Sequence, residues 1–221
     1  MSTGRKPRPL GRDERTFLDD RLFVIATEDR YAAKQYFDIL RTHVRSSRIK
    51  THVLPTEDCR SSPKHVFDRL LEFERLHESH ADDEKWLVLD TDHWIQDAHK
   101  KQLIEVFKLA RQKGYSVAMS RPCFEIWLLL HHHADIASLS ISKCEDVHPY
   151  LLTALGSYNK KHLHSAHYPL PAIHAAVQNA KVSDRDAHLD VPEGNGSRVY
   201  RIVEQILQSV PAHLRQGWPA P

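Results

Sequence analysis

The segment WLVLDTDHW, residues 86–94, decides what fold to expect. Its apolar run reaches Asp90 without interruption, which is typical of a strand buried inside a sheet. Asp92 follows two residues later, so both carboxylates point the same way if the extended geometry continues. Two acids at the end of a buried strand indicate an α/β sheet with a polar carboxyl edge, where such sheets bind their ligands.

The segments around this strand alternate between strand and helix patterns. Strands are predicted at 21–27, 49–54, 86–90 and 115–120, and helices between them at 31–44, 61–77 and 95–114. Strict alternation predicts a four-stranded, mainly parallel sheet flanked by helices, the α/β class. After Pro122 the pattern changes to helices at 123–133, 145–156, 169–182 and 197–210, with a turn-rich loop at 192–197.

This pattern divides the chain into four predicted parts. They are a basic flexible arm at 1–20, an α/β core at 21–122, a C-terminal helical part packed on the core at 123–212, and a tail at 213–221. The arm is read as a solvated tail, with contact to nucleic-acid phosphates as the less favoured alternative. The net charge of +2 by itself gives no reason to expect a nucleic-acid partner.

Composition and missing motifs exclude several classes. Three cysteines without a CxxC pair argue against a disulfide framework or a cysteine zinc site. No apolar stretch approaches the roughly 20 residues of a membrane span, and no signal peptide is present, so a cytoplasmic, reduced protein with no membrane partner is expected. The absence of P-loop, GxGxxG and GxSxG motifs disfavours NTPases, dinucleotide dehydrogenases and α/β-hydrolases.

Polar residues follow three of the predicted strands. Glu28 follows the first, Asp90 and Asp92 end the third, and the fourth is followed by a segment with Ser120, Arg121 and Glu125. Clustered carboxylates repel one another, and a hard cation such as Mg²⁺ (or Mn²⁺) relieves that repulsion. The competing interpretation is that the Asp pair caps the next helix or faces solvent. The presence of Glu28 after the first strand favours the metal site, in which Glu28 would either bind the metal or act as a general base.

Glu125 stands out because the residues around it are apolar. A buried, unpaired carboxylate costs several kcal/mol, so a partner is expected among Arg121, Lys160 and the metal cluster. A purely structural salt bridge remains an equal alternative.

Four segments of the chain resemble RloB-like proteins, the family that includes AbiLii. They are FVIATEDRYAAKQYF (23–37), LVLDTDHW (87–94), SRPCFEIWLLLHH (120–132) and NGSRVYRIVEQIL (195–207). The glutamate followed by DxD is also similar to the Toprim catalytic fold. The resemblance implies a Toprim-like core whose acids fall on Glu28, Asp90 and Asp92, and it places the family's YxK pattern on Tyr158 and Lys160.

The chain departs from the family's first motif, which reads like CEGxxTExxYF. Thr27, Asp29 and Ala33 stand where that motif has Cys, Gly and its second acid. The resemblance further implies Mg²⁺-dependent phosphodiester chemistry in bacterial anti-phage defence, often beside an ABC-type ATPase or a restriction locus.

Three functional hypotheses result. The leading one is a Mg²⁺-dependent Toprim-type nuclease acting as a defence effector, in which Ser120, Arg121, Glu125 and Lys160 bind the substrate. The residues do not distinguish DNA from RNA; analogy with small Toprim effectors paired to ATPases favours RNA, including tRNA. The second is a catalytically silent binding or regulatory subunit docked on an ABC-type ATPase, motivated by Ala33. The third is a small-molecule phosphotransferase or hydrolase. An oligomer is left open.

Overall fold

The computed structural model describes most of the chain. It covers residues 21–44, 46, 48–56, 61–92, 97–216 and 218, with only the backbone described for 97–99. The predicted basic arm at 1–20 and part of the predicted tail at 213–221 lie outside these residues. Within the described residues, no helix is both long and apolar enough to span a bilayer.

Five strands form one sheet in the order β2-β1-β3-β4-β5. They are β1 (Arg21–Thr27), β2 (Ile49–Val53), β3 (Glu84–Asp90), β4 (Ser116–Arg121) and β5 (Gly196–Ser197). The first four are parallel, as predicted, and β5 pairs antiparallel with β4. The prediction of a four-stranded sheet was therefore wrong by one strand. A two-residue strand has no readable periodicity, and the loop prediction for 192–197 included it.

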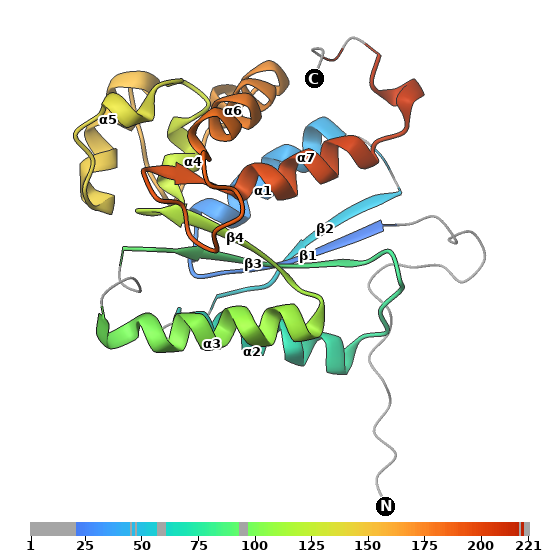
Figure 1. Ribbon diagram of the computed structural model, residues 1–221. Coiled ribbons are helices and arrows are strands. Elements are labelled where there is room, and N and C mark those ends of the chain that lie inside the picture. The colour runs from blue at the N-terminus through green and yellow to red at the C-terminus, as the bar shows by residue number, and fades with distance from the viewer. Residues whose placement is uncertain are drawn as a thin grey trace, which may run out of the picture.

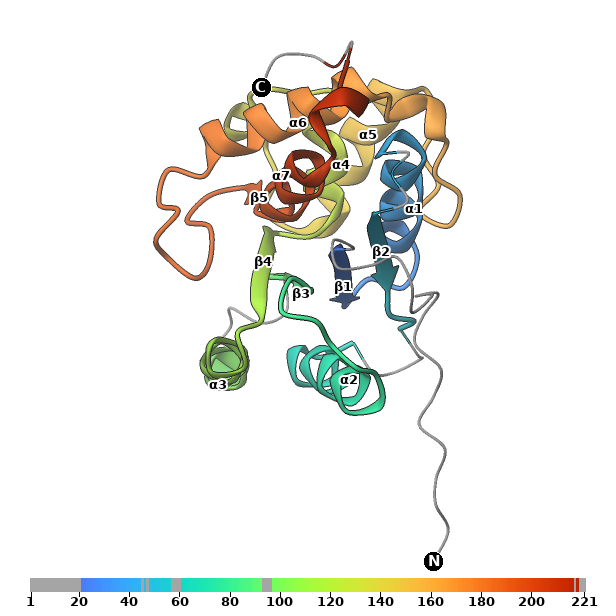
Figure 2. The same ribbon diagram turned by 90° about the vertical axis from the view of Figure 1, so that its right-hand side faces the viewer.

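Helices cover both faces of the sheet. They are α1 (Ala32–Val44), α2 (Pro63–Leu76), α3 (Asp97–Lys113), α4 (Glu125–Leu129), α5 (Val147–Leu155), α6 (Leu170–Ser183) and α7 (Val199–Ser209). Figure 1 shows α2 and α3 below the sheet and the other helices above it. The view turned by 90° in Figure 2 shows the same three layers, with α1 and α7 lying over the sheet.

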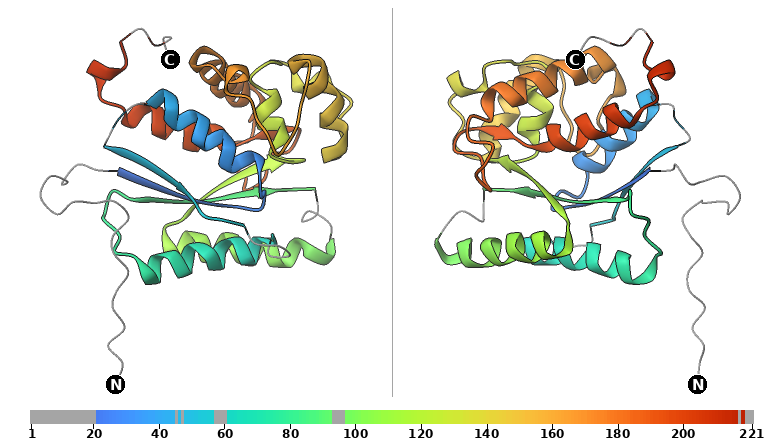
Figure 3. Two further views of the ribbon diagram at one scale, coloured as in Figure 1. Left: turned by 180° about the vertical axis from the view of Figure 1, so that it is seen from behind. Right: turned by 45° about the vertical axis from the view of Figure 1, so that its right-hand side comes forward.

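Each face of the sheet has its own hydrophobic core, because successive strand residues alternate sides. On β1, Val24 packs with α2 and α3, whereas Phe23 and Ile25 pack on the opposite face with α1 and the C-terminal helices. Residues after Pro122 therefore share one hydrophobic cluster with the sheet. The two further views in Figure 3 show these helices lying against the sheet from behind and from the side.

Local signals explain where several helices begin and end. The Ser62 side chain accepts a hydrogen bond from the His65 amide, and Pro63 occupies the first turn of α2, where its missing N–H has no cost. Gly114, with φ of 70°, follows α3 in the left-handed conformation that commonly ends a helix. The predicted helix at 123–133 is shorter, because after Leu129 the amides of His131 and His132 bond three residues back rather than four.

Candidate functional site

Glu28 and Asp90 meet at the carboxyl edge of the sheet. Strands β1 and β3 are hydrogen-bonded neighbours, and the Glu28 amide continues their ladder by donating to the Val88 carbonyl at 3.2 Å. The Asp90 amide in turn lies 3.4 Å from Glu28 Oε1, to which it donates. The parallel order of the strands therefore brings together two of the three predicted metal-binding acids.

Asp92 is held by the loop that follows β4. The Asp92 amide donates to the Pro122 carbonyl at 3.1 Å, and the Thr91 amide donates to the same oxygen at 3.0 Å. Strand β3 ends at Asp90, so Asp92 reaches the site through a short turn rather than through continued extended backbone. The charge of Asp92 nevertheless contributes to the raised pKa of Asp90.

Asp29 adds a fourth carboxylate, which the sequence analysis treated only as a departure from a motif. Its Oδ1 accepts hydrogen bonds from the amides of Tyr31 and Ala33, both at 2.9 Å, and so satisfies free N–H groups at the start of α1. Its Oδ2 lies 2.7 Å from Lys160 Nζ. Asp29 therefore fixes the turn after β1 and anchors a cation from the C-terminal part of the chain.

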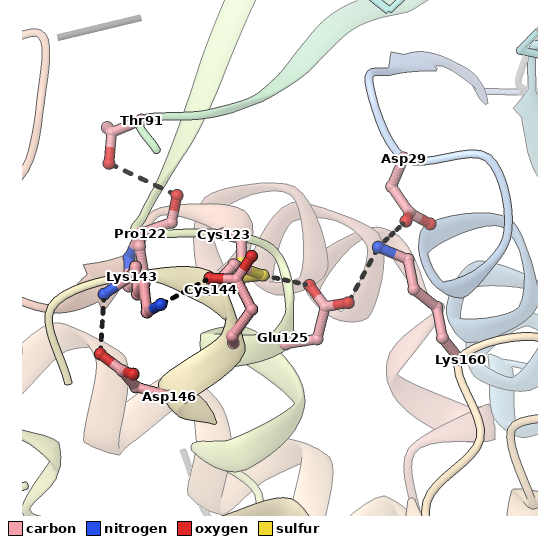
Figure 4. Close-up of a disulfide and its surroundings, with 10 residues drawn as sticks. Asp29, Thr91, Pro122, Cys123, Glu125, Lys143, Cys144, Asp146 and Lys160 are labelled. Carbon is pink, nitrogen blue, oxygen red and sulfur yellow. Dashed lines mark hydrogen bonds and ion pairs between the residues drawn. A yellow bond between two sulfur atoms is a disulfide. The ribbon is translucent and has the colours of Figure 1, made fainter. Parts of the chain in front are cut away.

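Lys160 is the partner of the buried Glu125. The distance from Lys160 Nζ to Glu125 Oε1 is 2.9 Å, so one ammonium group bridges Glu125 and Asp29. This confirms that Glu125 has a partner and selects Lys160 among the predicted ones. Burial alone would lower the pKa of Lys160, but the charges of Glu125 and Asp29 outweigh it and raise the pKa above its usual value. Figure 4 shows the three side chains in line.

The electrostatic centre of the cluster is Asp90. Burial raises the pKa of Asp90 well above its usual value, and the charges of Glu28, Glu125, Asp92 and Asp29 raise it further. Four carboxylates therefore act on Asp90 at this edge, and Lys160 offsets part of their charge. Such a cluster favours a bound cation or a retained proton.

Ser120 and Arg121 lie at the same edge but contact the segment around β5. The Ser120 hydroxyl is buried and lies 2.8 Å from the Ser197 hydroxyl. Arg121 Nη1 donates to the carbonyls of Pro192 and Glu193, at 3.2 and 2.7 Å. In this conformation both side chains join β4 to the β5 loop, and their predicted contact with substrate stays a prediction.

Cys123 and Cys144 form a disulfide beside Glu125. The sequence argument against a disulfide was therefore wrong for this pair. A separation of 21 residues carries no spacing signal, and the fold supplies the proximity by placing the segment before α5 against the start of α4. The third cysteine, Cys59, lies outside the described residues. In Figure 4 the disulfide and Lys160 lie on opposite sides of Glu125.

A pocket of about 590 Å³ adjoins the disulfide and the salt bridge. Its lining residues are Glu125, Cys144, Glu145, His148, Tyr158, Asn159 and Lys160. Burial raises the pKa of Tyr158 well above its usual value, and Glu125, Tyr168 and Asp29 add to the shift. Of the lining residues, Tyr158, Lys160 and Glu125 were singled out from the sequence.

The spacing of the acids limits how they could hold a metal ion. Among the described residues, one group of three His, Cys, Asp or Glu ligand atoms lies within 4.8 Å of one another, and it is Cys123, Glu125 and Cys144. The oxygens of Glu28, Asp90 and Asp92 are thus spread more widely. All are hard carboxylate donors, which suit Mg²⁺, and Mg²⁺ commonly keeps several waters between itself and its protein ligands. The donor set therefore fits a partly hydrated ion.

Sequence reasoning missed Asp29 and the cysteine pair. Asp29 carried a local signal, because an Asp shortly before an apolar helical pattern is a typical N-cap. Its ion-pair partner, Lys160, is 131 residues later in the sequence, so no local pattern could indicate the pair.

The chain was compared with known proteins in three ways. The model of a protein family described as RloB-like protein matches residues 23–206. No curated protein and no solved structure gave a significant match.

Proposed function

This chain belongs to the RloB-like family, and from that premise and its carboxylate cluster we propose that it is a Mg²⁺-dependent (or Mn²⁺-dependent) nuclease with a Toprim-like core. The observation that carries the proposal is the contact of Asp90 with Glu28 at the carboxyl edge of β1 and β3. Asp29, Asp92 and Glu125 act on the same Asp90 carboxyl. Five acids at the ligand edge of a parallel sheet are costly to maintain without a cation.

Glu28, Asp90 and Asp92 would hold the ion, which supplies positive charge to a phosphodiester during cleavage. The hydrogen bonds from the Thr91 and Asp92 amides to the Pro122 carbonyl fix the position of Asp92 relative to Asp90. Glu28 is half-buried, so its carboxylate can also accept a proton from an attacking water.

Lys160 organises the other side of the site. Its ammonium group holds Asp29 and Glu125 while 42% of its side chain stays exposed. That exposed part can attract a backbone phosphate, as a lysine does in non-specific nucleic-acid binding. Arg121 would serve the same purpose after releasing the carbonyls of Pro192 and Glu193. The proposed substrate is nucleic acid, with RNA including tRNA tested beside DNA.

A cleavage assay tests this proposal. Purified protein is incubated with DNA, total RNA and tRNA in Mg²⁺, in Mn²⁺ and in EDTA. Cleavage should require the cation and fall about a hundredfold or more in Asp90→Asn, because several kcal/mol of transition-state stabilisation are lost. Asp38→Asn is the matched control: Asp38 is half-exposed on α1 and pairs with Lys34 at the surface, so its activity should match wild type.

Three outcomes would count against the proposal. Equal cleavage by wild type and Asp90→Asn would assign the activity to a contaminant or another site. No cleavage of any nucleic acid, with and without a co-expressed ABC-type ATPase, would favour the silent regulatory subunit. Turnover of nucleotides in the same assay would favour the small-molecule phosphotransferase or hydrolase.

A further inference from the structure

A carboxylate oxygen faces sulfur beside the proposed nuclease site. Cys144 Sγ lies 3.6 Å from Glu125 Oε2, while Glu125 Oε1 is held by Lys160 at 2.9 Å. A sulfur in a disulfide carries no proton, so it cannot donate a hydrogen bond to this oxygen. In the oxidised chain this contact therefore contributes no hydrogen bond. After reduction, the same sulfur is a thiol that can donate a hydrogen bond to this oxygen, or a thiolate that can share a metal ion with it.

The distance from Cys144 to Glu125 matches that between two ligands of a metal site with sulfur ligands. Zn²⁺ binds thiolate at about 2.3 Å and carboxylate at about 2.1 Å, so two such ligands at a tetrahedral angle lie about 3.6 Å apart. The Cys144–Glu125 contact already has this length. The two sulfurs would need to separate to about 3.8 Å, which side-chain rotation allows once their bond is broken. Their Cα atoms, 5.5 Å apart, need not move.

We propose that reduction of the Cys123–Cys144 disulfide creates a Zn²⁺ site formed by both thiolates and Glu125, with water as the fourth ligand. A dithiol reductant supplies two electrons and two protons: the sulfur–sulfur bond breaks, two thiols form, and the reductant becomes a disulfide. Zn²⁺ then displaces the two thiol protons into solvent. This inference does not rest on the proposed nuclease activity.

The pocket gives access to one sulfur. Cys144 is half-buried and lines the pocket of about 590 Å³, whereas Cys123 is 1% exposed. An external thiolate would therefore attack Cys144, and Cys123 would leave. The same route admits the metal ion after reduction.

The ligand chemistry selects Zn²⁺ over Mg²⁺ at this position. Soft thiolates bind Zn²⁺ well and Mg²⁺ poorly, whereas the acids at the ends of β1 and β3 are all hard oxygen donors. Two thiolates and Glu125 carry three negative charges. The ion offsets two of them, and the Lys160 ammonium, which Glu125 shares with Asp29, offsets part of the third. The two positions are thus distinguishable by the metal that they take.

Cobalt(II) binding tests the proposal, because Co²⁺ occupies zinc sites and its thiolate charge-transfer absorption reports cysteine ligands. The full chain, freed of metal by chelation, is titrated with Co²⁺ and then Zn²⁺ after reduction with a phosphine and after oxidation. The reduced protein should show thiolate absorption with one ion per chain, displaced by Zn²⁺, and the oxidised protein should show none. Cys123→Ser and Cys144→Ser should lose the signal.

Matched variants separate this site from other ligands. Glu125→Gln should weaken Zn²⁺ binding roughly tenfold or more, since a charged ligand is lost. Glu145→Gln removes a carboxylate from the same pocket and should bind like wild type. Absorption that persists in the Cys123→Ser, Cys144→Ser double variant, or equal Zn²⁺ affinity in Glu125→Gln and Glu145→Gln, would overturn the proposal.

Alkylation of the wild-type chain avoids any folding defect of the serine variants. In the reduced protein, Zn²⁺ should slow the reaction of Cys144 with iodoacetamide, read by peptide mass spectrometry, at least tenfold. An unchanged alkylation rate would show that the reduced pair holds no zinc and would overturn the proposal.

Discussion

Substituting Lys160 with methionine tests how much its ion pairs with Asp29 and Glu125 stabilise the protein. The change removes the ammonium group that lies 2.7 Å from Asp29 Oδ2 and 2.9 Å from Glu125 Oε1, and it keeps a side chain of similar length. The side chains of Asp29 and Glu125 are only 2% and 8% exposed, so both carboxylates would remain buried without their partner.

The size of the effect follows from this burial. Breaking a fully buried ion pair costs about 3–5 kcal/mol. Because 42% of the Lys160 side chain is exposed, water screens part of the interaction, and we expect a loss of about 2 kcal/mol in the free energy of unfolding. For a chain of this size the melting temperature should fall by about 4–8 °C.

Urea and thermal unfolding at pH 7 measure this loss. Lys64→Met is the matched control, because Lys64 Nζ also lies 2.7 Å from a carboxylate oxygen, Asp68 Oδ1. In this pair, however, the side chains of Lys64 and Asp68 are both over 40% exposed. Its loss should stay below about 0.5 kcal/mol. Equal losses in the two variants would refute the argument that burial makes the Lys160 bridge important.

The other predictions concern three buried side chains. Burial is the main cause that lowers the pKa of His131 to about 3. The unfolded chain therefore binds a proton below pH 6.5 that the folded chain does not, and stability should fall by about 2 kcal/mol between pH 8 and pH 5. Urea unfolding of His131→Phe should lose this pH dependence, and an unchanged slope would contradict it. Burial alone would raise the pKa of Asp184, but hydrogen bonds and charge from Arg198, with Tyr200 and Arg201, outweigh it and lower the pKa. Its stabilisation is present above the usual pKa of about 4 and is lost as the pH falls through the lowered value. Asp184→Asn should cost about 2–4 kcal/mol at pH 7, measured by urea unfolding, with the difference from wild type shrinking in acid; a constant difference would contradict the assignment. Trp127→Ala should cost about 3–5 kcal/mol in the same assay, because Trp127 is fully buried, and a loss below 1 kcal/mol would show that the core refills the space.

Periodicity in the sequence was enough to predict the parallel strands and the acids at their ends. Apolar runs of strand length occur at 21–27 and 86–90, and each ends beside a carboxylate. Because neighbouring parallel strands end at one edge, the contact of Glu28 with Asp90 follows from the order of the strands. The partner of Glu125 was narrowed to a few candidates by the cost of burying its charge.

What the sequence did not predict depends on contacts between distant segments. Strand β5 is two residues long and is defined by its pairing with β4 rather than by its own pattern. The disulfide depends on how the segment before α5 returns to α4. Arg121 could be placed at the site's edge, but its contacts with the carbonyls of Pro192 and Glu193 depend on a loop some 70 residues later in the chain.

The nuclease proposal requires that Glu28, Asp90 and Asp92 share a divalent cation at the carboxyl edge of the sheet. An anomalous difference map from crystals soaked in Mn²⁺ locates such an ion directly. We expect a peak among these three side chains, with direct or water-bridged carboxylate ligands, and no peak there in Asp90→Asn crystals. A map without a peak at this edge, or with manganese bound only elsewhere in the chain, would contradict this arrangement.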